Sequence, residues 1–541
     1  MENETSQGVA ISVSTAIARE AKARFVIADW AQSIPGYLLL RNDDEVSIYY
    51  NELDEEAKDW LHDRLQDAGH RTMASTMAAL RNAERDPANS PIFDLLVLAK
   101  IIGEYIKRDA IDGWIYTIGE HGEHLPWLVT NVLYQETSNA PPCVAMYLAA
   151  NSATLNREDS ARPSTKVTYF FHEDIKNKKI SEVLAVKGFM KETPELKKAY
   201  VASMASFTRF LPQMNHQFVA TGGGLEIDLV NLYQTPERLF FDAPMKVIND
   251  EGLIRRKFFS KLDSPFWNMQ SRDYSDIPMH PKIFCFNLET HTNMWIHADN
   301  LAEYQYTSSL RTKLVLPQHH RDLIDILTQD MDVLMDDIII GKSGGTTILC
   351  KGAPGLGKTL TAEVYAEVVQ RPLYRVHSGQ LGVVSEDVDR SLAQILKRAQ
   401  RWGAVMLIDE ADVYIRKRGN DIDHNAVVAS FLRTLEYFHG LLFLTTNRTD
   451  DVDDAIVSRC IATIRYEPPG EENAKQIWRV LSDQFQFPLS AEIIDELICC
   501  FPGVSGRDIK ELMKLTAKWC RQKKVEPSVA VFQACAQFRG L

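Results

Sequence analysis

Gly352-Ala353-Pro354-Gly355-Leu356-Gly357-Lys358-Thr359 is the most informative stretch of this sequence, because it fits the pattern G-x-x-x-x-G-K-[ST]. The β-branched run from Thr346 to Cys350 before it predicts a buried strand. Leu360 to Gln370, after it, contains no Gly or Pro and predicts a helix. A glycine-rich loop between strand and helix lets backbone N–H groups and the positive end of the helix dipole point at a phosphate. The stretch therefore predicts an ATP or GTP site.

Within this site, we expect the nucleotide to lie against the residues from Gly352 through Leu360. Lys358 is expected to reach the β- and γ-phosphates, and the Thr359 hydroxyl is expected to hold Mg²⁺. An alternative is a chance match to the pattern, which the strand before the loop and the helix after it disfavour.

Two further apolar runs end in polar side chains. Val405 to Ile408 predicts a buried parallel strand that delivers Asp409 and Glu410 to its carboxyl end, where α/β sheets place ligands. Asp409 is positioned to hold the Mg²⁺ shell and Glu410 to polarise an attacking water, although acids at a strand end can also be helix caps. Leu441 to Thr446 predicts a third strand, after which Asn447 can orient that water.

Composition limits the class of protein. The chain has 541 residues, enough for about three or four domains at ~150 residues each. Its net charge of −13 argues against a nucleic-acid partner, and its eight scattered cysteines suit reduced thiols. The acidic, polar N-terminus does not resemble a signal peptide, and no apolar run approaches the ~18 residues of a membrane helix. We expect a soluble intracellular protein, cytoplasmic or nuclear, without a membrane span.

The motifs GAPGLGKT, LIDEAD, LTTNR, VSRC and GVSGRDI, in this order, resemble the AAA+ ATPases, and specifically the AAA clade. The segments RPLYRVHSGQLG, NAVVASFLRTLEYFHGLLFLTTNR and AIVSRC are similar to a branch of AAA-domain proteins known mainly from fungi. The resemblance covers roughly residues 314–541. PERLFFDAP resembles the N-terminal domain of that branch, whereas residues 1–160 resemble no family.

The resemblance implies an α/β P-loop NTPase core, a five-stranded parallel sheet between helices (αβα), over residues 313–468, with a C-terminal helical lid at 469–541. It also implies a hexameric ring with ATP between subunits. By motif match, the Walker roles fall to Lys358, Thr359, Asp409 and Glu410. Asn447 corresponds to sensor 1, Arg459 to the arginine finger supplied to a neighbour, and Arg507 to sensor 2, where the AAA clade proper often has Ala. Each arginine alone would be an ordinary surface residue.

One loop departs from the family pattern. AAA unfoldases usually carry an aromatic–hydrophobic–Gly pore loop after the second core strand, predicted here at Pro372 to His377. This chain has Ser378-Gly379-Gln380-Leu381-Gly382-Val383-Val384-Ser385 there, which is shorter and has no aromatic residue. We therefore do not expect polypeptide threading.

The N-terminal half predicts a mixed α/β structure without a catalytic constellation. We expect residues 1–160 to be mostly helical, with Asn51 capping a helix from Glu52 to Gln66 and a second helix from Arg71 to Arg85. His121 and His124 lie in a loop that could bind zinc, but without further marked ligands a solvated loop is favoured.

Residues 161–312 predict a β-rich middle domain. It includes a helix from Pro194 to Arg209 capped by Thr193, a flexible turn at Gly222 to Gly224, and a hairpin of Lys282–Leu288 with Asn293–Ala298. Dense aromatics favour core packing over base stacking, because basic residues do not alternate with them. The aromatics are Phe240, Phe241, Phe258, Phe259, Phe266, Trp267, Phe284, Phe286 and Trp295.

Two stretches near the nucleotide module leave alternatives open. The stretch Asp336 to Gly341 can clamp an adenine ring or form a plain connecting turn. The basic run Lys518 to Lys524 on the lid favours a solvated helix end over a nucleic-acid contact.

The favoured function is an ATP-hydrolysing ring that remodels a protein partner held by the N-terminal half. A nucleotide-gated assembly scaffold with little turnover is the alternative, and a nucleic-acid motor is disfavoured by the acidic balance. The presence of Glu410, Asn447 and Arg459 favours the enzyme, since a scaffold does not need groups that activate water.

Overall fold

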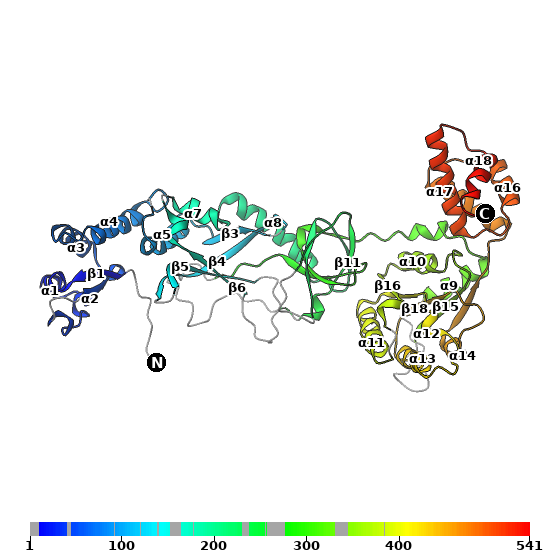
Figure 1. The fold of residues 1–541 in the computed structure, drawn as a ribbon, viewed down its shortest axis with the longest axis horizontal. Coiled ribbons are helices and arrows are strands. Elements are labelled where there is room, and N and C mark those ends of the chain that lie inside the picture. The colour runs from blue at the N-terminus through cyan, green and yellow to red at the C-terminus, as the bar shows by residue number, and fades with distance from the viewer. Residues whose placement is uncertain are drawn as a thin grey trace.

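The computed structural model describes residues 10–40, 45–90, 92–119, 121–137, 140–151, 164–176, 178–229, 237–254, 256, 276–329, 345–382 and 385–541. Their strands form sheets of two, seven, five and five strands. The sheets lie along an elongated molecule, with the N-terminal elements at one end and the C-terminal lid at the other (Figure 1). Within the described part, every helix is too short or too polar to span a bilayer.

The N-terminal end combines a two-stranded sheet with helices. β1 (Ala10–Ser14) pairs antiparallel with β2 (Glu45–Tyr49). The predicted helix from Arg71 to Arg85 is confirmed as α4. The predicted Asn51 cap is wrong, because residues 50–52 form a short 3-10 turn and the Asp54 side chain accepts the Ala57 N–H at 2.7 Å. The other helices here are α1 (Thr15–Arg24), α2 (Asp29–Gln32), α3 (Glu55–Asp67) and α5 (Leu95–Lys107).

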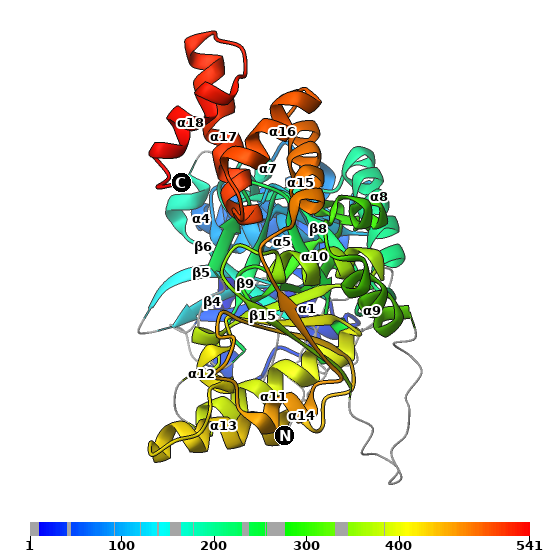
Figure 2. The same ribbon diagram turned by 90° about the vertical axis from the view of Figure 1, so that its right-hand side faces the viewer.

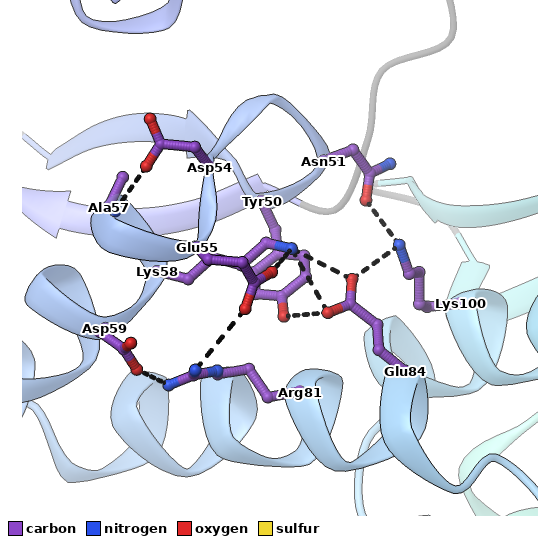
Figure 3. Close-up of polar contacts among 10 residues, drawn as sticks. All are labelled: Tyr50, Asn51, Asp54, Glu55, Ala57, Lys58, Asp59, Arg81, Glu84 and Lys100. Carbon is purple, nitrogen blue, oxygen red and sulfur yellow. Dashed lines mark hydrogen bonds and ion pairs between the residues drawn. The ribbon is translucent and has the colours of Figure 1, made fainter.

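An ion-pair network joins α3, α4 and α5 (Figure 3). Glu84 of α4 lies 3.3 Å from the Lys58 amino group of α3 and 3.2 Å from the Lys100 amino group of α5. The Tyr50 hydroxyl also donates to Glu84, at 3.1 Å, and burial raises the pKa of Tyr50 further than the nearby Glu84 charge does. Because each of these partly buried groups has partners, the network fixes how the helices lie against each other.

The next sheet crosses residue 160. Its order is β6-β5-β4-β3-β7, and β6 pairs with β5 from Val144↔Phe170 to Ala150↔Ser164. The strands are β3 (Trp114–Ile118), β4 (His124–Thr137), β5 (Ala140–Ala150), β6 (Ser164–Phe170) and β7 (Phe189–Lys191). Strands on either side of the predicted boundary at residue 160 thus belong to one sheet, and the described residues before it include strands β1 to β5 as well as helices α1 to α5. The Ala- and Pro-containing β5 has weak strand propensity and forms because it pairs with strands on both sides.

Helices cover this sheet. The predicted helix at Pro194 is confirmed as α8 (Pro194–Phe210), and Thr193 caps it by accepting the Leu196 N–H at 3.2 Å. α8 packs on β4, as does α5. The shorter helices here are α6 (His172–Ile175) and α7 (Ile180–Val186).

The middle sheet has the order β10-β9-β13-β12-β11-β8-β14, and its neighbouring strands pair antiparallel. Its strands are β8 (Gln217–Ala220), β9 (Gly223–Ile227), β10 (Glu237–Phe240), β11 (Met245–Asn249), β12 (Lys282–Asn287), β13 (Asn293–His297) and β14 (Leu301–Glu303). The β12–β13 hairpin was predicted and is confirmed. The flexible turn predicted at Gly222 to Gly224 is wrong, because β9 begins at Gly223, where a Cβ would lie 2.4 Å from the Leu239 carbonyl oxygen.

The aromatic residues of the middle sheet do not all share one role. Phe284 and Trp295 are buried with ring centroids 5.1 Å apart, and Phe286 is buried as well, as predicted for a core. Phe240, in contrast, is 65% exposed and packs edge-on against His121. Phe258, Phe259, Phe266 and Trp267 lie outside the described residues.

The loop between β3 and β4, which contains His121 and leads into His124 of β4, contacts the middle sheet. The His121 ring nitrogen contacts the Leu239 carbonyl oxygen at 2.9 Å, and Glu123 forms a 2.8 Å ion pair with Lys282 in which both side chains are 7% exposed. Gly122 and His124 are exposed, as expected of a solvated loop, whereas His121 and Glu123 are partly buried against the middle sheet. Among the described residues no cluster of three or more potential ligands could hold a metal.

A parallel sheet, which with its helices we call the P-loop domain (residues 318–329 and 345–468), follows the middle sheet. Its order is β16-β17-β18-β15-β19, as expected for a P-loop NTPase core. Helices α9 and α10 lie on one face and α11 to α14 on the other (Figure 1). The strands are β15 (Thr346–Gly352), β16 (Leu373–His377), β17 (Val405–Asp409), β18 (Leu441–Thr446) and β19 (Ala462–Tyr466). The helices are α9 (Gln318–Gln329), α10 (Lys358–Val368), α11 (Ser385–Trp402), α12 (Asp412–Ile415), α13 (Ile422–Leu435) and α14 (Asp454–Arg459).

The C-terminal lid (residues 469–541) is all-helical and rises from the P-loop domain on the side of α10 (Figure 2). Its own apolar core includes Trp478, Leu497 and Phe532, each at most 2% exposed. The lid helices are α15 (Glu471–Gln484), α16 (Ala491–Cys500), α17 (Gly506–Lys523) and α18 (Val529–Gln537).

The middle sheet docks on the P-loop domain through charge and aromatic contacts. The fully buried Asp250 accepts hydrogen bonds from the Arg401 guanidinium at 2.6 and 2.8 Å and from the Trp402 indole at 2.9 Å. Phe286 of β12 packs against Trp402, with centroids 5.0 Å apart. Glu367 of α10 accepts from the Tyr304 hydroxyl at 2.5 Å. The helix that begins at the glycine-rich loop is therefore tied directly to the middle sheet.

Candidate functional site

The glycine-rich loop has the backbone geometry of a phosphate cradle. Gly355 and Gly357 adopt φ values of 83° and 96°, in the left-handed region that side chains disfavour. Gly357 caps the N-terminus of α10, so the positive end of the helix dipole faces the loop. Lys358 is buried, and its amino group donates to Gly352 O, Ala353 O and Asn447 Oδ1 at 2.9, 2.8 and 2.9 Å. Burial lowers the pKa of Lys358.

Asp409, at the end of β17, is the most densely bonded carboxylate of the site. Its Oδ1 accepts from the Thr359 hydroxyl at 2.9 Å and from the Thr445 hydroxyl at 2.6 Å. Its Oδ2 accepts from the Arg375 guanidinium at 2.6 Å. Burial alone would raise the pKa of Asp409, but these hydrogen bonds and the arginine charge outweigh it and hold the pKa below its usual value.

Glu410 and Asn447 end neighbouring strands and line the same cavity. Glu410 has a φ of 54°, a strained conformation for a residue other than Gly, and its N–H donates to the Thr445 hydroxyl at 3.0 Å. The N–H of Asn447 donates to the Asp412 carboxylate at 3.2 Å, and the Thr446 hydroxyl donates to the same oxygen. Asp412, which the sequence analysis did not single out, thus holds the backbone of Asn447 in place.

These groups surround a cavity of about 1650 Å³. Residues from Pro354 to Leu360 line it, together with Asp409, Glu410 and Asn447. Gly352 and Ala353 lie behind the loop and contribute the carbonyls that hold Lys358. The other walls come from the middle sheet, the segment before α9 and the lid, and include Lys246, His291, Leu316, His320, Ile477 and Gln484. No sequence motif marked these residues, because only folding brings them to the cavity.

The two predicted arginines lie in different places. Arg507, in the first turn of α17, lines the cavity, and its N–H donates to Gly355 O at 3.1 Å. Arg459, at the end of α14, does not line the cavity that the described residues form; it pairs with Glu436 and donates to Ala455 O at 3.2 Å. Within one chain, the structure therefore brings Arg507 but not Arg459 to the phosphate cradle.

The loop after β16 is held in place by the Tyr414 hydroxyl. The Tyr414 hydroxyl lies 2.6 Å from Ser378 O and 2.7 Å from Gly382 O, and Leu381 is fully buried. Tyr414 follows Asp409 and Glu410 in sequence and stacks on Phe431. Val383 and Val384 lie outside the described residues, as does the stretch 336–341 proposed for adenine.

The residues present fit a nucleoside triphosphate with Mg²⁺. The loop supplies backbone donors and a buried ammonium group for phosphates, and the Thr359 hydroxyl and Asp409 carboxylate are oxygen ligands of the type that Mg²⁺ prefers. His320 lines the cavity, and its buried Nδ1 lacks a hydrogen-bond partner among the described residues, so a polar ligand could satisfy it.

Comparison with known proteins agrees with this geometry. Residues 348–467 match the family model described as "ATPase family associated with various cellular activities (AAA)". A putative 26S proteasome regulatory subunit homolog of Methanothermobacter marburgensis is 29% identical over 180 residues, 31% of this chain and 48% of that protein. The ATPase family gene 2 protein of Schizosaccharomyces pombe is 28% identical over 174 residues, 30% of this chain and 21% of that protein.

An ATPase family AAA domain-containing protein 3A homolog of Drosophila melanogaster is 24% identical over 205 residues, 34% of each chain. A solved chain of the E. coli MS115-1 HORMA:CdnC:Trip13 complex is 17% identical, with a TM-score of 0.36, over 42% of this chain and 91% of that chain. The chain thus contains an AAA ATPase domain and spans about half, or less, of the length of these curated relatives.

Proposed function

We propose that this AAA ATPase domain hydrolyses ATP and that the chain acts as an oligomeric ring, hexameric by family expectation, that remodels a protein partner. The observation that carries the proposal is the convergence of Lys358, Asp409, Glu410 and Asn447 on one cavity, from the helix and strand ends that follow the glycine-rich loop. A binding module needs the cradle, whereas Glu410 and Asn447 serve a reaction with water.

Each residue has a distinct part in the proposed reaction. The loop N–H groups and Lys358 bind the phosphates, and Lys358 exchanges its present carbonyl acceptors for phosphate oxygens. Thr359 and Asp409 would hold Mg²⁺, which when bound supplies charge that stabilises the phosphate oxygens. Asn447 orients a water molecule, and Glu410 accepts its proton as the water oxygen bonds to the γ-phosphorus and the bond to the β–γ bridging oxygen breaks.

Arg459 is proposed to act on the nucleotide of a neighbouring subunit, since it lies outside its own cavity, and Arg507 to act in its own subunit. The partner is proposed to be a protein, and membership of a mainly fungal branch remains a proposal from sequence resemblance. All eight cysteines are free, which supports the proposed intracellular location, cytoplasmic or nuclear.

The test compares Lys358→Ala with Glu410→Gln. Lys358→Ala removes the phosphate-binding cation, so nucleotide binding should be lost. Glu410→Gln removes only the proton acceptor, so binding should persist while phosphate release falls by about 10²-fold or more. Calorimetric binding and phosphate release are measured on both variants. Equal loss of binding in the two would contradict the role of Glu410, and wild-type binding without turnover would favour the nucleotide-gated scaffold.

A further inference from the structure

A guanidinium group lies inside the proposed metal site. Arg375 Nη2 binds Asp409 Oδ2 at 2.6 Å, on the side of the carboxylate opposite the oxygen that accepts from Thr359 and Thr445. Arg375 also lines the nucleotide cavity. Both carboxylate oxygens of Asp409 therefore already accept hydrogen bonds, and the donor to Oδ2 is a permanent cation.

Strand pairing places Arg375 at this point. β16 pairs in parallel with β17, with Arg375 opposite Leu407 and His377 opposite Asp409. Tyr374 and Val376 point into the core on the α11 side of the sheet, so Arg375 points to the other face, toward α10 and the cavity. There its Nη1 lies 3.4 Å from Glu363 of α10.

The middle sheet holds the strand that carries Arg375. The His291 ring, in the β12–β13 turn, lies 5.2 Å from the Tyr374 ring, and Phe286 packs edge-on against Tyr374 at 5.8 Å. β16 is an edge strand of its own sheet, and these contacts support its outer side. The position of Arg375 therefore depends on packing that is independent of the nucleotide.

We propose that Arg375 is a built-in counter-cation of the nucleotide site: it weakens Mg²⁺ binding by holding Asp409 and supplies positive charge to the phosphates when Mg²⁺ is scarce. The proposal rests on the proposed function, because it concerns ATP in the same cavity. A divalent cation that uses Asp409 must share or displace the guanidinium and is repelled by it. The same guanidinium lowers the energy of a tetra-anionic nucleotide that arrives without a metal.

The charge-removing variant is Arg375→Met, which keeps the aliphatic length of the side chain. Because the Arg375 side chain is 39% exposed, the electrostatic effect is screened, and we expect the Mg²⁺ concentration for half-maximal nucleotide binding to fall about tenfold. Nucleotide affinity in EDTA should weaken about three- to tenfold, for the same reason. Arg375→Lys keeps the charge and should remain close to wild type in both measurements.

Arg433→Met is the matched control. Arg433 does not line the cavity that the described residues form, and its guanidinium pairs with Asp389 at 2.8 Å. The variant loses the same formal charge, so a change in net charge alone would move both variants alike, whereas the proposal predicts little change in Arg433→Met. Arg375→Gln is a second neutral variant. Thermal unfolding without nucleotide shows whether each variant is folded.

Binding of the non-hydrolysable probe adenylyl-imidodiphosphate is measured by calorimetry, in EDTA and over a series of Mg²⁺ concentrations. The proposal is supported if Arg375→Met needs less Mg²⁺ for half-maximal binding and binds the probe more weakly in EDTA, while Arg375→Lys stays near wild type in both measurements. A higher Mg²⁺ requirement in folded Arg375→Met or Arg375→Gln would overturn it, because Arg375 would then only orient Asp409. No change in either measurement would overturn it too. Failure of the wild-type chain to bind the probe would instead overturn the proposed function.

Discussion

The N–H of Arg507, in the first turn of the lid helix α17, donates a hydrogen bond to the carbonyl oxygen of Gly355, at 3.1 Å. The lid thus touches the phosphate loop directly, and Gly355 has two reasons to lack a side chain. Its φ of 83° disfavours one, and a Cβ there would lie 2.8 Å from Ser505 Oγ and 2.9 Å from Arg507 Cβ. The N-terminus of the lid helix can approach the loop this closely only because Gly355 has no side chain.

This contact predicts that Gly355→Ala destabilises the chain more than Gly357→Ala. Both substitutions force a side chain into the left-handed region, at a cost of about 1–2 kcal/mol. Nothing lies within 4 Å of a Cβ at Gly357, whereas at Gly355 the collision with the lid adds about 1–3 kcal/mol. Thermal unfolding without nucleotide measures the difference, and hydrogen exchange in the first turn of α17 localises it. Equal losses in the two variants would show that the lid does not press on Gly355.

A second prediction concerns Arg459. If Arg459 stabilises charge on the nucleotide of a neighbouring subunit, Arg459→Ala should bind ATP normally and hydrolyse it about 10³- to 10⁵-fold more slowly. Mixing it with Lys358→Ala should restore part of the activity, because one variant supplies the cavity and the other the arginine.

Arg433→Ala is the control for Arg459, since Arg433 is also an exposed arginine paired with one carboxylate, that of Asp389. It should leave hydrolysis unchanged. Phosphate release from the mixture is compared with release from each variant alone, after mass measurement shows that mixed oligomers form. Mixed oligomers with no recovery of activity would argue against a shared site.

A third prediction uses the buried pair of Glu123 and Lys282, which joins the sheet of β3 to β7 to the middle sheet. Burial by itself would raise the pKa of Glu123, but the Lys282 charge and hydrogen bond outweigh it and lower the pKa to about 2. A carboxylate whose pKa is lowered on folding stabilises the native state above its unfolded pKa of about 4.3. That stabilisation is lost as the pH falls through about 2.

Glu123→Gln should therefore destabilise the chain at about pH 7, by about 3–5 kcal/mol, because Lys282 is left buried without its counter-charge. The difference from wild type should shrink below about pH 4. Burial lowers the pKa of His280 to about 3 and the Glu123 charge acts to raise it, so the substitution also shifts the titration of His280, and the difference reports both groups. Urea unfolding at several pH values measures it. A difference that stays constant down to low pH would mean that the pair does not set the pH dependence.

The local features of this protein could be predicted from short stretches of its sequence. The glycines of the loop, the apolar strands ending at Asp409 and Asn447, and the cap at Thr193 are encoded within a few residues of where they act. Backbone propensity, side-chain periodicity and capping chemistry act over such short distances, so these elements and the site residues on them could be predicted.

Contacts between residues that are distant in sequence depend on the tertiary structure. Arg375 reaches Asp409 because β16 pairs with β17, and Glu123 reaches Lys282 across 159 positions of sequence. β5 forms a strand in spite of weak local propensity, because β4 and β6 pair with it on either side. Strand order and the docking of sheets depend on how much apolar surface distant segments bury against each other. A short stretch of sequence does not contain that information.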